Sequence, residues 1–141
     1  MAQLAEFIGN HLLLSLAFLV TFFLLVMMTL SEKMQAFTSI NPAQLTQLVN
    51  HQNAIVIDTR APDAFAQGHI TNAINIPLSD FTSNTVPFEK YKNNTVIAYC
   101  ISGITSRSAC KKLINAGIKN VYNLSGGIKA WTGDKLPVIK S

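Results

Sequence analysis

The chain has 141 residues, of which 49% are hydrophobic and 13% charged, and its formal net charge is +4 at pH 7. This length suits one domain plus a further segment. The positive charge is mild and forms no basic run interleaved with aromatic residues, which argues against a nucleic-acid surface. With only two cysteines, the chain suits a reducing compartment, and we expect no structural disulfide.

The first predicted element is an apolar helix long enough to cross a membrane. Residues 12–30 include no charged residue, and as a helix they would span about 29 Å, against a hydrocarbon core of about 30 Å. We therefore predict a transmembrane helix over 12–30, preceded by a short N-terminal tail over 1–11. A cleaved signal peptide is the main alternative, but it requires a basic start, and the tail has no Lys or Arg. A buried core helix is the other alternative.

The basic residues indicate how this helix is oriented. All eleven Lys and Arg residues follow the apolar segment, beginning with Lys33. Because basic residues favour the cytoplasmic side, we predict a single-pass inner-membrane protein with a cytoplasmic C-terminal domain and membrane lipid around 12–30. Residues 31–141 hold all eleven cations and six of the seven acids, a formal charge of +5. That charge favours anionic lipid or small anionic substrates as contacts.

A polar linker over 31–37 leads to a domain at 38–141, in which strands and helices alternate. The predicted strands are 54–58, 73–76, 95–99 and 121–124, and the predicted helices are 43–49, 61–67, 106–116 and a short one carrying Trp131. We expect a short helix and a surface loop between 78 and 94. This alternation predicts an α/β domain with a mostly parallel central sheet flanked by helices.

The segment after the strand at 95–99 carries the group with the clearest chemistry. Cys100 stands at the carboxyl end of that strand, and a short polar stretch with one glycine leads to a helix beginning at Ser106. The free N–H groups of a helix N-terminus favour negative charge and lower a cysteine pKa from about 8.5 to between about 3.5 and 7.5. We therefore predict a nucleophilic thiolate at Cys100. A small core residue is the alternative.

Other segments are expected to meet Cys100, because ligands bind beyond the carboxyl ends of the strands in open α/β sheets. Asp58 and Arg60 lie at the carboxyl end of one predicted strand, and residues 125–127 lie at that of another. Cys110 lies on the packed face of the helix behind the loop, which favours a buried residue over a resolving thiol. The histidines form no cluster with other ligands, so we expect no metal site.

Three blocks of the sequence, in this order, resemble the rhodanese-like sulfurtransferase family, and together they cover about residues 38–138. The first block consists of residues 57–60, 68–70 and 73–77. The second is 99–106. The third consists of residues 121–128, 131 and 136–138. A rhodanese-like domain preceded by one transmembrane helix is similar to the membrane-anchored bacterial members of the family.

The resemblance implies a sulfurtransferase that passes sulfane sulfur through a Cys100 persulfide to a thiophilic acceptor, without a cofactor. The implied partners are a small sulfur donor, a thiol acceptor and a membrane or cytoplasmic protein, with no nucleic acid. The resemblance assigns Asp58 and Arg60 as supporting residues that brace the sheet end. The loop over 100–105 is similar to that of mercaptopyruvate-type sulfurtransferases. The implied substrate-binding residues are Ile101, Ser102, Gly103, Ile104, Thr105, Ser106 and Arg107.

Two other functions are considered. A phosphatase or arsenate reductase of related architecture needs cysteine, five residues and then arginine, so that the guanidinium grips an oxyanion. Here Ser106 stands at that position and Arg107 comes one residue later, which argues against such an enzyme. The second is a membrane-tethered rhodanese-fold platform that binds a protein with little or no catalysis. The sequence leaves it open.

Overall fold

The computed structural model describes residues 11–33, 37–83 and 87–140, and the chain falls into two compact units that divide between residues 35 and 36. The tail predicted over 1–11 lies outside the described residues except for His11. The central part of the predicted linker lies outside them too.

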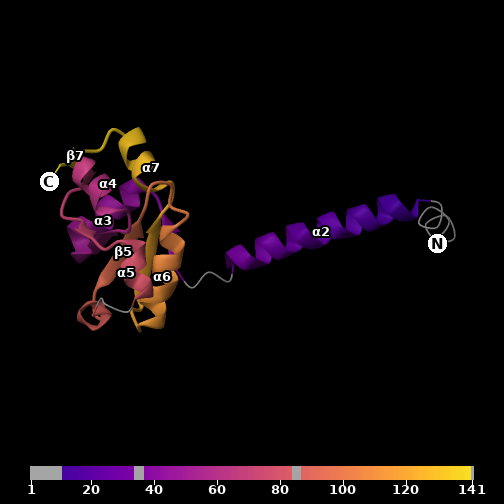
Figure 1. Cartoon of the computed structure of the whole chain (residues 1–141), viewed down its shortest axis with the longest axis horizontal. Helices are drawn as coiled ribbons and strands as arrows, with labels where there is room; N and C mark the ends of the chain where they lie inside the picture. The colour runs from indigo at the N-terminus through magenta and orange to yellow at the C-terminus, as the bar shows by residue number, and fades with distance from the viewer. Residues whose placement is uncertain (1–10, 34–36, 84–86, 141) are drawn as a thin grey trace. The chain divides into compact units, whose positions relative to one another are not determined.

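The N-terminal unit consists of one long helix, α2 (Leu12–Lys33), drawn in indigo in Figure 1. It contains the helix predicted over 12–30 and continues three residues into the predicted linker. Its side chains are described from 13 to 27, and most of them are large, apolar and exposed. Among the residues that the structure describes, no helix is both long and apolar enough to cross a membrane. The transmembrane span predicted over 12–30 is therefore not supported there.

The C-terminal unit is built on a five-stranded parallel sheet with the strand order β1-β6-β5-β2-β4. The strands are β1 (Thr38–Ile40), β2 (Ile55–Asp58), β4 (Ile74–Asn75), β5 (Thr95–Tyr99) and β6 (Asn120–Leu124). All five residues of the central strand β5 are buried. Such continuous apolar strands are typical of parallel sheets that are covered on both faces. The predicted α/β fold is confirmed for this unit.

Helices cover both faces of this sheet (Figure 1). Side chains alternate along a strand, so Val96 and Ala98 pack on one side of the sheet, whereas Ile97 and Tyr99 pack on the other. The first side is covered by α5 (Leu78–Thr82), the 3-10 helix η1 (Phe88–Tyr91) and α6 (Ser106–Asn115). The second side is covered by α3 (Pro42–Gln52) and α7 (Gly127–Gly133). The remaining helix is α4 (Pro62–Gln67).

Three short strands were not predicted from the sequence. β1 lies at one edge of the sheet, beside β6. The other two, β3 (His69–Ile70) and β7 (Val138–Ile139), form a separate antiparallel pair. Strands of two or three residues are too short to show an alternating pattern, and their pairing depends on tertiary contacts.

Candidate active site

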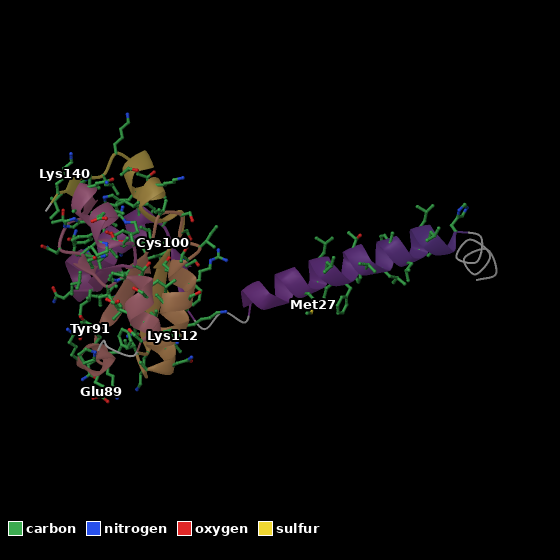
Figure 2. All side chains as sticks on the ribbon, in the orientation of Figure 1. Met27, Glu89, Tyr91, Cys100, Lys112 and Lys140 are labelled. Carbon is green, nitrogen blue, oxygen red and sulfur yellow. The ribbon has the colours of Figure 1, made fainter. Side chains whose placement is uncertain are left out.

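Cys100 follows the last residue of β5 and so lies at the carboxyl edge of the central sheet. Figure 2 labels it well away from Tyr91, which precedes the same strand at the other end. The residue is 5% exposed, and its thiol is free. A buried cysteine at this edge has a polar environment rather than a purely apolar one, because the loop wraps around its sulfur.

Three hydrogen bonds converge on the sulfur of Cys100. The backbone N–H of Gly103 lies 3.2 Å from Sγ, and the backbone N–H and the hydroxyl of Ser106 each lie 3.4 Å from it. Ser106 is the first residue of α6, so its N–H is one of the groups that a helix N-terminus leaves without an intrahelical acceptor. The predicted placement of the thiol at a helix N-terminus is therefore present.

These donors favour the charged form of the thiol. Burial by itself raises a cysteine pKa, because the thiolate loses water. Hydrogen bonds from Ser106 and from the backbone of Ser102 and Gly103 act in the opposite direction and prevail, so that the pKa of Cys100 lies below its ordinary value. A lowered pKa favours the thiolate, which is the nucleophilic form. The catalytic role of Cys100 stays a prediction at this point.

The loop's N–H groups face the sulfur because its carbonyl groups accept hydrogen bonds from the β6–α7 segment on the other side. The N–H of Ile128 donates to the carbonyl of Cys100 at 2.9 Å, and the N–H of Lys129 donates to that of Ile101 at 3.2 Å. The side-chain amide of Asn123 donates to the carbonyl of Gly103 at 3.0 Å. The β6–α7 segment thus fixes three carbonyl groups of the loop, those of Cys100, Ile101 and Gly103.

This contact between the loop and the β6–α7 segment is close enough to require glycine. Gly103 has φ +77°, and a Cβ there would lie 3.0 Å from the nitrogen of Gly126 and closer still to the carbonyl oxygen of Leu124. Gly127 has φ +57°, and a Cβ there would lie 2.7 Å from backbone atoms of Ile101. Side chains are disfavoured both by these conformations and by the space available.

The hydroxyl of Ser106 has two acceptors and one proton to donate. Its Oγ lies 2.7 Å from Oδ1 of Asn123 and 3.4 Å from Sγ of Cys100. With a neutral thiol, the hydroxyl donates to Asn123 and accepts from the S–H group. With a thiolate, it can turn its proton to the sulfur. Asn123 is buried on β6 and was missed by the sequence reasoning, although a polar residue inside the apolar strand 121–124 was a usable signal.

Alanine at position 106 is expected to raise the pKa of Cys100, because the variant loses the hydroxyl donor and keeps only backbone donors. A hydrogen bond to a charged group contributes about 1.5 kcal/mol or more, so the alkylation rate of Cys100 below its pKa should fall about tenfold. The pH dependence of iodoacetamide alkylation measures this. Ser108→Ala, on the exposed face of the same helix, is the matched control. An unchanged pH profile for Ser106→Ala would contradict the assignment.

Most of the other predicted substrate-binding residues point to solvent and not to the sulfur of Cys100. Ile101, Ile104, Thr105 and Arg107 are exposed, and within the described loop none of them donates a hydrogen bond to Sγ. Thr105 is the N-cap residue of α6 and makes no side-chain cap bond. Their role in binding substrate stays a prediction.

Asp58 and Arg60 form the ion pair expected at the neighbouring strand end. The Nη2 atom of Arg60 lies 2.6 Å from Oδ2 of Asp58 and also donates to the carbonyl of Gly68 at 2.8 Å. Asp58 is fully buried. Burial lowers the pKa of the Arg60 guanidinium, but the hydrogen bond and the charge of Asp58, together with Tyr99, outweigh this, and the net direction is upward. The pair connects β2 with the segment before β3.

Thr59, between these two residues, links them to the cysteine loop, and the sequence reasoning missed it. Its N–H and its hydroxyl both donate to the carbonyl of Tyr99 at 2.9 Å. Tyr99 directly precedes Cys100, and the guanidinium of Arg60 lies 5.8 Å from the centre of its ring. The end of β5 is therefore held from the β2 side as well as from β6.

Cys110 is fully buried on α6, and its sulfur lies 3.5 Å from the carbonyl of Tyr122. Burial raises the pKa of this thiol to about 12. It is therefore a poor nucleophile, in contrast with Cys100. In the part of the chain that the structure describes, no three His, Cys, Asp or Glu residues are grouped so as to hold a metal ion.

Comparisons with known proteins agree with this arrangement. The model of the rhodanese-like domain matches residues 41–134. Uncharacterized protein YibN of Escherichia coli (strain K12) is 30% identical over 141 residues, which cover 99% of each chain. Thiosulfate sulfurtransferase GlpE of Coxiella burnetii is 30% identical over 95 residues, which cover 67% of this chain and 87% of that protein. The crystal structure of a rhodanese-related protein from Thermoplasma volcanium superposes with a TM-score of 0.63 at 28% identity, over 74% of this chain and all of that one.

Proposed function

We propose that this chain, which belongs to the rhodanese-like domain family, is a sulfurtransferase that carries sulfane sulfur as a persulfide on Cys100. The observation that carries the proposal is the set of three hydrogen bonds that converge on Cys100 Sγ at the carboxyl edge of the sheet. Convergent N–H groups form an anion-binding concavity. Such a concavity suits both the thiolate and the negatively charged outer sulfur of a persulfide.

The proposed reaction has two steps, each a displacement at sulfur. In the first, the Cys100 thiolate attacks the sulfane sulfur of the donor, a new S–S bond forms, and the donor's leaving group departs with the electron pair of the broken bond. In the second, a thiophile attacks the outer sulfur, and Cys100 leaves as a thiolate. No base is needed at Cys100 once the thiolate has formed.

Two donors are the first to test. The Coxiella burnetii relative is named a thiosulfate sulfurtransferase, which makes thiosulfate one of them. The loop over 100–105 is similar to that of mercaptopyruvate-type enzymes, which makes 3-mercaptopyruvate the other. The segment 100–106 includes no charged side chain, so an anionic donor would rely on backbone N–H groups and the hydroxyl of Ser106.

Mass spectrometry of the full chain after incubation with each donor tests the proposal. We expect a mass gain of one sulfur atom, located on the peptide that includes Cys100 and removed by cyanide. A chain that gains no sulfur from either donor, and whose Cys100 alkylates with the pH profile of an ordinary thiol, would contradict it. That result would favour the protein-binding platform instead.

We also propose that residues 12–30 hold the protein at the inner membrane, with the domain on the cytoplasmic side. The exposed apolar side chains of α2, among them Leu13, Phe18 and Phe23, support this location. A helix that is apolar on all sides needs an apolar environment. All eleven cations follow this segment, as expected for a domain on the cytoplasmic side.

The double variant Leu19→Lys, Phe23→Lys is expected to be released from membranes. Each lysine is unfavourable in the apolar part of a bilayer by up to about 3 kcal/mol, so the double variant should move from the carbonate-resistant pellet to the supernatant. A control with Gln47→Lys and Ser108→Lys, both exposed in the domain, adds the same charge and should stay in the pellet. If the unaltered chain itself is found in the supernatant, the location is wrong.

A further inference from the structure

We propose that the surface around Cys100 binds a polypeptide whose acceptor cysteine lies among apolar side chains with acidic residues around them. The inference rests on the proposed function and names its acceptor class: a thiol presented by a protein or peptide. It is drawn from the apolar side chains of the loop, from the distribution of charge around them, and from the recessed position of the sulfur.

The apolar part of the surface is formed by Ile101 and Ile104. Within residues 37–83 and 87–140, they are the most exposed large apolar side chains, at 50% and 66%. The other exposed side chains of this kind are between 39% and 42% exposed, namely Ile74, Val138 and Ile139. Both isoleucines belong to the loop that surrounds the nucleophile. Exposed apolar groups gathered at a reactive centre mark a contact surface rather than a structural need.

Basic residues border these isoleucines. Arg107 donates its backbone N–H to the carbonyl of Ile104, and Lys129 donates its own to the carbonyl of Ile101, each at 3.2 Å. Both basic residues are exposed. Arg107 and Lys129 therefore carry positive charge next to the two isoleucines. Acidic residues on the partner would meet these cations, which steers association and fixes its orientation.

The exposed isoleucines around the recessed sulfur favour an acceptor with apolar side chains over a small hydrophilic thiol. Cys100 is 5% exposed, so an acceptor has to come into contact with the loop to reach the outer sulfur. A hydrophilic acceptor would lose water against two isoleucine side chains without gaining a polar partner from them. Apolar side chains next to an acceptor cysteine would cover the same isoleucines and remove both surfaces from water.

The transfer balances without any further reactant. The partner's thiolate attacks the outer sulfur of the Cys100 persulfide, and a new S–S bond forms on the partner. The bond between the two sulfurs on Cys100 breaks, and its electron pair stays on Cys100 as the thiolate. The proton of the outer sulfur, where present, travels with it. One persulfide is consumed and one is formed, so no oxidant or reductant is involved.

Synthetic acceptor peptides test the proposal on the full chain in detergent, loaded with sulfur by inorganic polysulfide. The probe has one cysteine flanked by leucines and then by aspartates. One control peptide replaces the leucines by serines, and another replaces the aspartates by lysines. Relative to transfer to cyanide, we expect the probe to accept sulfur about tenfold faster than either control. The advantage over the lysine peptide should shrink as salt is raised.

Variants locate the effect on the loop. The double variant Ile101→Ser, Ile104→Ser should lose the preference for leucines, whereas Ile139→Ser, an exposed apolar residue on β7, should keep it. Equal rates for the three peptides, or a preference that survives in the double variant, would overturn the inference. Transfer to cyanide but to no peptide would overturn it and leave the proposed function standing. A chain that never gains sulfur on Cys100 would overturn both.

Discussion

Serine in place of Cys100 is expected to abolish sulfur loading while the domain stays folded. The variant keeps a side chain of similar shape whose oxygen can accept the bonds now made to Sγ by Gly103 and Ser106. A neutral serine hydroxyl is a weak nucleophile towards sulfur, and the described residues that hydrogen-bond to Sγ, Gly103 and Ser106, are not bases. We expect the transfer rate to fall by about 10⁴-fold or more, with a stability change within about 1 kcal/mol.

Cys110→Ser is the matched control for this experiment. Cys110 is the other cysteine of the chain, and its sulfur lies 3.5 Å from the carbonyl of Tyr122, where a serine hydroxyl can donate the same bond. The raised pKa of this thiol keeps it protonated at neutral pH. The variant should therefore load and transfer sulfur at the rate of the unaltered chain.

Loading is measured by the mass of the intact protein, and transfer by the thiocyanate formed from cyanide. Retention of sulfur in Cys100→Ser would show that the sulfur is held elsewhere and would contradict the proposed chemistry. Loss of transfer in Cys110→Ser, with the fold retained, would indicate that the second thiol takes part. Thermal unfolding of both variants separates these outcomes from simple misfolding.

The sequence was sufficient to predict the central elements of the site. Local patterns placed Cys100 between a buried strand and a helix that begins at Ser106, and both boundaries agree with β5 and α6. The run at 95–99 predicted a buried strand, because its five consecutive residues are apolar or β-branched. These features depend on short stretches of chain, which is why they are visible without a structure.

Features that depend on contacts between distant segments were not predictable in this way. The bonds of Asn123 to Gly103 and Ser106 join β6 to a loop some twenty residues earlier. A polar residue in the apolar strand 121–124 signals that a partner exists, but the sequence does not say which residues provide it. The exposure of Ile101 and Ile104 could not be predicted either, because an isoleucine at these positions is as compatible with a buried loop as with an exposed one. The fold shows that residues of the β6–α7 segment donate hydrogen bonds to the loop's carbonyl groups. The side chains of Ile101 and Ile104 remain exposed to solvent.

Gly127→Ala is expected to destabilise the domain, because residue 127 packs against the backbone of the cysteine loop although it lies outside that loop. A Cβ there would overlap the carbonyl oxygen of Cys100 and the carbonyl group of Ile101, and φ is +57°. Strain at a positive φ and overpacking against backbone atoms together should lower the stability of the domain by about 3 kcal/mol. For a domain of this size the midpoint of thermal unfolding should fall by about 15 °C.

The same substitution should also raise the pKa of Cys100. The N–H of Ile128 holds the Cys100 carbonyl at 2.9 Å, and pushing α7 away turns the loop's N–H groups from the sulfur. Alkylation of Cys100 should then require a higher pH in the variant than in the unaltered chain, at a temperature where both are folded. Thermal unfolding and the pH profile of alkylation measure the two effects.

Gly133→Ala separates this effect from a general sensitivity of α7. Gly133 ends the same helix, its φ is not positive, and a Cβ there would have no atom within 4 Å. Since alanine favours helix over glycine by up to about 1 kcal/mol, this control should be as stable as the unaltered chain or slightly more so. If Gly127→Ala were equally harmless, the β6–α7 segment would not be what holds the cysteine loop. The orientation of the loop's N–H groups towards Cys100 would then need another cause.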